Sequence, residues 1–298
     1  MRVAYLGPPG TYSEEALRAS APPGVEEVPH PTIYDAVMAV HEGSVDRAVV
    51  PIENALEGAV AVTLDTLALE AGDVHIVAEV VHPIHHCVVA ARDLELSQVT
   101  RVVSHPQATA QCSRFLRERL PEAERVVAPS TADAVLSIRD SSGPEVALGS
   151  RLAAELYGCR VLESNVEDGP ANVTRFVWLA RERSTAEEAA KTSVVFWGGG
   201  DQSPGWLVAC LSELSERGVN LTRIESRPRR TALGHYMFFV DLEGGSTERS
   251  VSDALDALGG HTEALRVIGS YTILNPASGY TQPDRETAHG TDPRGRGR

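Results

Sequence analysis

The sequence is poor in cysteine and basic residues and has no long hydrophobic run. Its four cysteines are far apart and form no Cys-x-x-Cys pair, so we expect reduced, mostly buried thiols rather than disulfides or a zinc knuckle. No apolar stretch approaches the ~18 residues that span a membrane, and the N-terminus reaches a turn before a signal-peptide core forms. With 27 Lys and Arg against 41 Asp and Glu, the charge of −14 argues against nucleic acid or an anionic membrane as the main partner. We therefore expect a cytoplasmic protein whose partner is a small molecule or another protein.

The hydrophobic content is nevertheless sufficient for ordinary cores, at 42% of 298 residues, and this length favours two domains. Over the first 180 residues, short β-branched runs alternate with amphipathic helical patterns, which is typical of an α/β fold. Helices are expected at 33–40 and after Pro106. Strands are expected at 2–6, 47–52, 74–81, 86–90, 101–103, 125–128, 146–148 and 173–179.

A charged stretch at 181–188 interrupts this pattern and indicates a linker. The chain beyond it has the order βαββαβ, with strands at 193–197, 221–227, 236–241 and 265–271, which is the split βαβ arrangement. The end of the chain is rich in Gly, Pro and charge and lacks apolar periodicity. We predict domains at 1–182 and 192–275 and a disordered tail at 276–298.

Several strands of the first domain run directly into polar residues at a helix start, where free N–H groups attract anions. The first is Gly7-Pro8-Pro9-Gly10-Thr11-Tyr12-Ser13-Glu14, in which Thr11 and Glu14 have capping-box spacing. Gly7 and Gly10 would let the backbone approach a ligand closely, although an ordinary glycine turn explains them as well. The others are Pro51-Ile52-Glu53-Asn54 and Ser104-His105-Pro106-Gln107, for which helix capping is the alternative.

Arg175 stands in the apolar strand Asn172-Val173-Thr174-Arg175-Phe176-Val177 and needs a carboxylate or a ligand as its partner. Strict alternation sends Thr174 and Arg175 to opposite faces. Either the strand starts irregularly, or Arg175 supports the site from behind, or it makes a structural salt bridge. The run His82-Pro83-Ile84-His85-His86 does not favour a metal site, because its histidines point to both faces and no acidic residue lies within it.

Together these motifs resemble the prephenate dehydratase family with a C-terminal ACT regulatory domain. The resemblance covers about residues 1–271. Its last motif is Gly218-Val219-Asn220-Leu221-Thr222-Arg223-Ile224-Glu225-Ser226-Arg227-Pro228. It implies a catalytic domain of two α/β lobes, similar to type II periplasmic binding proteins, followed by a ferredoxin-like ACT domain. It also implies a hydro-lyase that converts prephenate to phenylpyruvate in phenylalanine biosynthesis, losing carbon dioxide and water, without metal or organic cofactor.

The resemblance also implies roles for particular residues. Thr174 would assist the departing hydroxyl, and we interpret it as a hydrogen-bond donor, because a threonine hydroxyl is too weak an acid to be a free proton source. The implied catalytic residues are Thr174, Glu53, Asn54, Ser104 and Gln107, and the implied substrate-binding residues are Gly10, Thr11, Ser13, Arg175 and Phe176.

The implied effector is L-phenylalanine, bound between paired ACT domains of a homodimer or homotetramer. The matching residues are Gly205, Trp206, Leu207, Asn220, Leu221, Glu225, Ser226 and Arg227. Trp206 replaces the alanine usual in the family, so its indole would fill or reshape the effector pocket. Ala55, where serine is frequent, would alter a helix cap. The alternatives are an arogenate dehydratase, a prephenate decarboxylase, and a regulator that binds an amino acid without catalysis.

Overall fold

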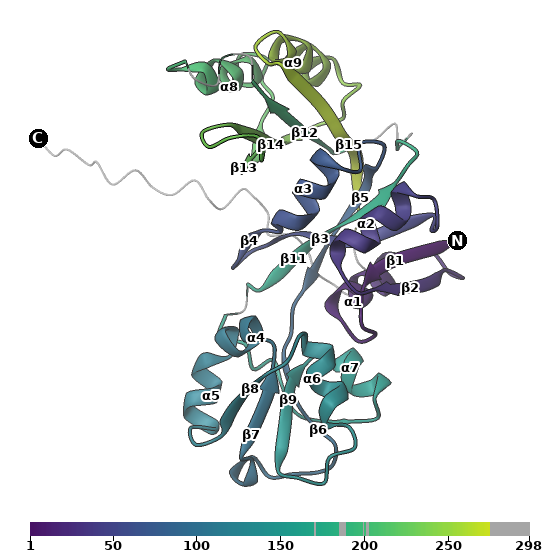
Figure 1. Cartoon of the computed structure of the whole chain (residues 1–298), viewed down its shortest axis with the longest axis vertical. Helices are drawn as coiled ribbons and strands as arrows, with labels where there is room; N and C mark the ends of the chain where they lie inside the picture. Colours follow the sequence, from purple (N-terminus) through teal and green to yellow (C-terminus); the bar gives the residue numbers. More distant parts are fainter. Residues whose placement is uncertain (170, 185–188, 199, 201–202, 275–298) are drawn as a thin grey trace, which may run out of the picture.

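The computed structural model describes residues 1–169, 171–184, 189–198, 200 and 203–274. Within them, strands form a ten-stranded mixed sheet and a separate five-stranded mixed sheet. Figure 1 shows the five-stranded sheet at the lower end of an elongated molecule, and helices α8 and α9 at the upper end.

The first lobe contains one side of the large sheet. Its strands follow the order β5-β11-β3-β1-β2, with β1 parallel to β2 and β3, and with β11 antiparallel to β3 and β5. Its elements are β1 (Arg2–Leu6), α1 (Tyr12–Ser20), β2 (Glu26–His30), α2 (Ile33–His41), β3 (Arg47–Asn54), β4 (Gly58–Ala59), α3 (Ala61–Leu69), β5 (His75–Pro83) and β11 (Val173–Ala180).

The second lobe is inserted between β5 and β11, so the chain crosses between the lobes twice, at 84–86 and 165–172. Its sheet has the order β10-β6-β9-β7-β8. The elements are β6 (Cys87–Ala90), the 3₁₀ helix η1 (Leu96–Gln98), β7 (Arg101–Ser104), α4 (Pro106–Gln111), α5 (Ser113–Arg119), β8 (Glu124–Val127), α6 (Thr131–Ile138), β9 (Glu145–Gly149), α7 (Arg151–Leu156) and β10 (Arg160–Ser164).

The C-terminal unit continues the large sheet, because its last strand pairs in parallel with β5 of the first lobe. Its strands follow the order β13-β14-β12-β15, which is that of a split βαβ unit. The elements are β12 (Lys191–Trp197), α8 (Trp206–Glu216), β13 (Leu221–Pro228), β14 (Tyr236–Glu243), α9 (Arg249–Gly259) and β15 (Ala264–Leu274).

The hydrophobic cores follow from this arrangement. One core combines Ile76 and Val177 of the first lobe with Phe239, Ile268 and Tyr271 of the C-terminal unit. Separate cores lie beneath the helices of the second lobe and beneath α8 and α9. The C-terminal unit is therefore packed against the first lobe by apolar side chains as well as by strand pairing.

The structure differs from the sequence predictions in a few elements. Strands β2 and β10 were not predicted, and the helix expected after Pro106 is interrupted at Cys112, where the backbone leaves the helical region with φ −110° and ψ 21°. Residues 185–188 of the predicted linker and the predicted tail lie outside the described residues. The four cysteines are unpaired, and three of them are buried.

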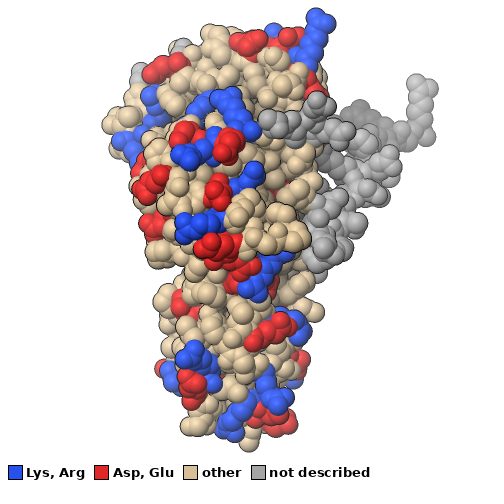
Figure 2. Space-filling view, turned by 90° about the vertical axis from the view of Figure 1, so that its right-hand side faces the viewer, with Lys and Arg blue, Asp and Glu red and all other residues tan. Residues whose placement is uncertain are grey.

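Figure 2 shows acidic and basic side chains intermixed over the face that it draws. In the described part of the chain, no helix combines the length and the apolar character needed to cross a membrane.

Candidate active site

A cavity of about 330 Å³ lies between the two lobes, which is within the range of small-ligand sites. The first lobe contributes the start of α1, the end of β3 and the start of β11. The second lobe contributes α4 and the start of α6. The polar lining residues are Thr11, Tyr12, Ser13, Asn54, His86, His105, Gln107, Gln111, Ser130, Thr131 and Thr174.

Thr174 and Asn54 are directly hydrogen-bonded in this cavity. Asn54 Nδ2 donates to Thr174 Oγ1 at 2.9 Å. The orientation of the Asn54 amide is fixed, because its Oδ1 accepts from the backbone N–H groups of Leu56 and Glu57 at 2.9 and 3.0 Å. The Thr174 oxygen is thus an acceptor toward Asn54, which leaves its hydroxyl hydrogen to donate to a ligand.

A series of hydrogen bonds extends from Asn54 to other side chains, and each bond fixes which atom of the next side chain accepts. Asn54 Nδ2 also lies 3.1 Å from Asn172 Oδ1, and Asn172 Nδ2 donates to Gln111 Oε1 at 2.8 Å. His86 Nε2 lies 2.9 Å from the same Gln111 oxygen, so it carries the ring hydrogen. His86 Nδ1 lies 2.8 Å from the hydroxyl of Tyr12, and that hydroxyl donates to His85 O at 3.0 Å. Burial lowers the pKa of His86, which favours this neutral form of the ring.

Gln111 is one of several cavity residues that the sequence analysis did not assign to the site, together with Tyr12, His86, Ser130 and Thr131. Because its Oε1 accepts two hydrogen bonds, its Nε2 is directed elsewhere, and this buried atom has no hydrogen-bond partner in the described part of the chain. An unpaired buried donor is costly, so a ligand acceptor in the cavity would satisfy it. Gln111 lies one helical turn after Gln107, on the same face of α4, and that spacing is the signal that could have identified it.

The N-terminus of α1 supplies further donors. Thr11 caps this helix, because its Oγ1 accepts from the N–H of Glu14 and donates to Leu6 O. Ser13 is only 4% exposed, lines the cavity, and has no partner for its hydroxyl among the described residues. Free N–H groups of the first helical turn and this hydroxyl together suit an anionic group.

The cavity lining carries no formal charge other than that available to histidine. None of its described lining residues is Lys, Arg, Asp or Glu. A dianionic ligand would therefore be held by neutral donors and helix termini rather than by a resident cation.

Arg175 and Glu53 are not in the cavity, contrary to the expectation that they bind substrate or act in catalysis. Thr174 and Phe176 line the cavity, so alternation along β11 directs Arg175 to the opposite face. There its Nε lies 3.2 Å from Glu53 Oε2. Of the three possibilities left open by the sequence, the structure has Arg175 behind the site in a salt bridge.

Ser104 and Gly10 also differ from their predicted positions. The Ser104 hydroxyl is buried and donates to Leu148 O at 3.0 Å, inside the second lobe. Gly10 contacts the second lobe, because a Cβ at this position would lie 2.9 Å from both Cα and Cβ of Ala153. Its carbonyl accepts from Ser150 Oγ at 2.8 Å. The glycine thus allows close approach of the two lobes rather than of a ligand.

The histidine run between the lobes serves in hydrogen bonding. His82 pairs with Glu15 at 3.0 Å, His85 pairs with Glu167 at 2.8 Å, and His86 belongs to the cavity network. Within the described residues, no three His, Cys, Asp or Glu side chains gather as a metal-ligand set.

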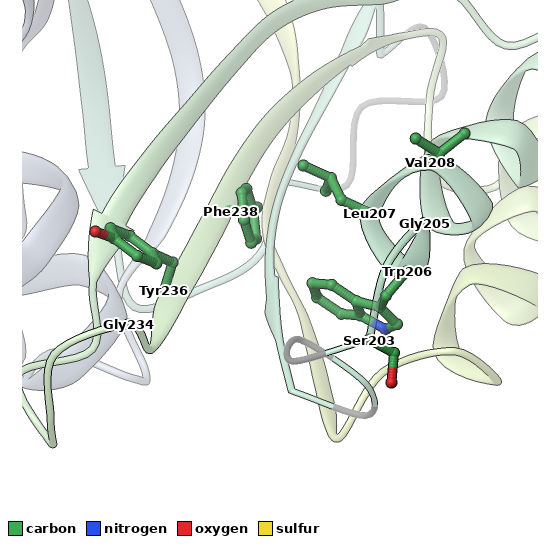
Figure 3. Close-up of a pocket in the computed structure, with 8 residues that line it drawn as sticks. All are labelled: Ser203, Gly205, Trp206, Leu207, Val208, Gly234, Tyr236 and Phe238. Atoms are coloured by element: carbon green, nitrogen blue, oxygen red, sulfur yellow. The ribbon is translucent and has the colours of Figure 1, made fainter.

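A second hollow, of about 180 Å³, lies in the C-terminal unit between α8 and β14 (Figure 3). Three of the predicted effector residues, Gly205, Trp206 and Leu207, line it together with Tyr236 and Phe238. The indole of Trp206 forms one wall: its Nε1 donates to His261 O at 2.7 Å, and its ring packs against Phe196 and Phe238.

The other predicted effector residues lie on or next to strand β13 and do not line this hollow. Arg227 instead makes a two-bond contact with Asp65 of α3, at 2.9 and 2.7 Å. Asn220 and Ser226 are exposed, and Leu221 and Glu225 are partly exposed. Strand β13 is the edge of the large sheet.

Comparisons with known proteins match this chain to prephenate dehydratases and also to one structure with a different described activity. Residues 3–184 match the family model described as prephenate dehydratase. A prephenate dehydratase of Amycolatopsis methanolica is 37% identical over 98% of this chain and 95% of its own length. The structure of a prephenate dehydratase from Arthrobacter aurescens in complex with L-Phe has a TM-score of 0.83, with 38% identity over 91% of this chain and 90% of that one. A further solved structure, GqqA, described as a novel type of quorum-quenching acylase, has a TM-score of 0.80, with 33% identity over 94% of this chain and 99% of that one.

An α/β fold with a neutral, donor-rich cavity between two lobes defines an enzyme-like binder of a small anionic molecule. The extent of the sequence matches makes the assignment more specific. The chain belongs to the prephenate dehydratase family, and it is a carbon–oxygen lyase of aromatic amino acid biosynthesis.

Proposed function

We propose that the cavity between the lobes binds prephenate and that Thr174 donates its hydroxyl hydrogen to the departing ring hydroxyl. The observation that carries this role is the Asn54–Thr174 hydrogen bond, which occupies the threonine oxygen and leaves its hydrogen free. Asn54 acts as a positioning residue whose own orientation depends on two backbone N–H groups.

The reaction needs little from the protein beyond orientation and a proton. The bond between the ring carbon and the carboxylate breaks, its electron pair moves through the ring, and the bond to the hydroxyl oxygen breaks as the ring becomes aromatic. Prephenate dianion and one proton give phenylpyruvate anion, carbon dioxide and water. Thr174 would stabilise the leaving oxygen by a hydrogen bond, and solvent supplies the net proton.

The substrate carboxylates would be held by neutral donors. Ser13 and the first N–H groups of α1 suit one of them, and Gln111 Nε2 suits a second acceptor from the opposite lobe. Prephenate is favoured over arogenate, because the described lining residues include no Asp or Glu to pair with the ammonium group of arogenate.

An acylase function, as in the description of GqqA, is less well supported by the site. Acyl transfer by a hydroxyl requires an adjacent base to activate it. The hydrogen-bond partner of Thr174 Oγ1 in the described structure is the amide of Asn54, which is not a base.

We further propose that residues 1–182, which resemble type II periplasmic binding proteins in their two lobes, form the catalytic domain. Residues 192–275 would form an ACT domain, for which the βαββαβ order and the hollow beside Trp206 are the support. L-Phenylalanine would bind there and inhibit the enzyme. Pairing of two copies would bring the β13 residues of one beside the hollow of the other, as a homodimer or homotetramer in the cytoplasm.

The test is an ultraviolet assay for phenylpyruvate with Thr174→Val and the matched control Thr174→Ser. Valine keeps the shape but lacks the hydroxyl, so we expect kcat to fall about 100-fold or more, whereas serine retains substantial turnover. Parallel assays with arogenate test the substrate preference, and assays with an acyl-amide substrate test the acylase alternative. Assays with added L-phenylalanine test the proposed inhibition. Full turnover by a folded Thr174→Val variant would refute the role of Thr174, and wild-type protein inactive on prephenate would refute the substrate.

A further inference from the structure

Six charged side chains meet where the C-terminal unit contacts the first lobe, behind the candidate active site. Arg175 is at their centre: Nη2 lies 2.6 Å from Asp241 Oδ2, and Nη1 lies 3.0 Å from Glu79 Oε2. Three of the six come from the first lobe and three from the C-terminal unit, and cations and carboxylates balance. The six are Glu53, Glu79 and Arg175, and Lys191, Arg223 and Asp241.

Five of these six side chains are largely removed from water, and the sixth, Glu53, is 37% exposed. The side chains of Asp241, Glu79 and Arg175 are 2%, 3% and 10% exposed. Burial disfavours the ionised carboxylate of Asp241, but Arg175 and Arg223 outweigh it and hold the pKa of Asp241 below its ordinary value. A buried guanidinium that loses such a partner moves or admits water, because an uncompensated charge in the interior is costly.

Two members of this cluster, Arg175 on β11 and Glu53 on β3, are adjacent in sequence to Thr174 and Asn54. Thr174 pairs in register with Asn54, and Arg175 pairs in register with Glu53. A bulge follows at once between Arg175 and Phe176, and the β3–β11 pairing resumes beyond it with its register shifted by one residue. The Arg175–Glu53 ion pair on the back of the sheet therefore adds a side-chain contact between the two strands beside this bulge, next to the Asn54–Thr174 hydrogen bond on the other face.

We propose that Asp241 of the C-terminal unit is a positioning residue for the dehydration, holding Arg175 so that Asn54 remains hydrogen-bonded to Thr174. The inference rests on the proposed function of Thr174. It also gives the C-terminal unit an indirect part in catalysis, through Arg175. Tyr236 and Phe238, which line its hollow, lie on the same strand as Asp241. A ligand that displaces β14 would act on Thr174 through this contact.

The experiment compares Asp241→Asn with Asp65→Asn in the full-length chain. Both variants remove one buried carboxylate that joins the C-terminal unit to the first lobe, but the ion-pair partners of Asp65 in the described structure are Arg227 and Arg230, neither of which lies on β11. We expect Asp241→Asn to lower kcat about tenfold or more with KM unchanged, since sub-ångström misplacement of a reacting group is costly. Asp65→Asn is expected to retain the wild-type kcat.

A double variant separates positioning from charge balance. Asp241→Asn with Arg223→Gln again equalises cations and carboxylates, so thermal stability should recover while kcat stays low. Recovery of both, or an equal loss of kcat in Asp65→Asn, would overturn the proposal.

A spectroscopic measurement makes the test independent of turnover. In ¹⁵N-labelled protein, the Asn54 side-chain NH₂ signals, identified by their loss in Asn54→Asp, should shift in Asp241→Asn and not in Asp65→Asn. Unchanged signals with unchanged kcat would refute the positioning role while leaving the dehydratase function intact. If wild-type protein does not convert prephenate but the Asn54 signals still shift in Asp241→Asn, only the dehydratase function is refuted.

Discussion

At the scale of single residues, the orientation of the site depends on backbone donors that no motif reveals. The N–H groups of Leu56 and Glu57 fix the amide of Asn54, and from there each side chain fixes the next as far as Gln111. Resemblance to a family assigned importance to Asn54 and Thr174. It did not include Gln111, because the polarity of a hydrogen-bond chain exists only in three dimensions.

Gln111→Leu tests the buried Nε2 donor that has no hydrogen-bond partner in the described structure, on a residue that lines the cavity. We expect KM for prephenate to rise about 10- to 100-fold, because a hydrogen bond to a charged group contributes roughly 1.5–3 kcal/mol. The matched control is Gln107→Leu, one helical turn earlier on α4, where the side chain is exposed and the effect should be smaller. Steady-state kinetics of both variants decide the question, and a larger effect at Gln107 would show that the assignment is reversed.

At the scale of elements, the sequence predicted most strands and the alternation of side chains along β11, and it failed where local pattern and fold disagree. Strand β2 reads Glu-Glu-Val-Pro-His, which lacks a β-branched run, and it forms because β1 offers it a parallel edge. Alternation correctly separated Thr174 from Arg175. The mistaken position of Gly10 has another cause: a glycine that allows contact between two lobes has the same sequence signature as one that allows contact with a ligand.

Gly10→Ala tests that contact between the lobes. The new methyl group would clash with Ala153 of α7 and would also require an unfavourable positive φ of 92°. Gly24→Ala is the matched control, since it has a similar φ of 82° with nothing within 4 Å of the added Cβ. We expect Gly10→Ala to lower the free energy of unfolding by about 1–3 kcal/mol more than the control. Equal losses in denaturant titrations would mean that only backbone strain is involved.

At the scale of the whole molecule, the boundary that the sequence marks by composition is not a boundary of the sheet. Strand β5 pairs with β11 on one side and with β15 of the C-terminal unit on the other. An apolar core and the balanced charges around Arg175 extend across the same junction. Composition detects a linker, whereas strand pairing between distant segments depends on the assembled fold.

This continuity predicts that the chain unfolds as one cooperative unit. Detaching the C-terminal unit alone would expose the edge of β5 and leave Arg175 and Glu79 buried without Asp241 and Lys191, so a state with only that unit unfolded is costly. Differential scanning calorimetry at fixed protein concentration should give a single transition whose calorimetric and van't Hoff enthalpies agree. L-Phenylalanine should raise that one midpoint, because a ligand stabilises whatever unfolds together with its site. Two resolved transitions, only one of them responsive to L-phenylalanine, would instead mean that the two parts unfold independently and that the junction contributes little to stability.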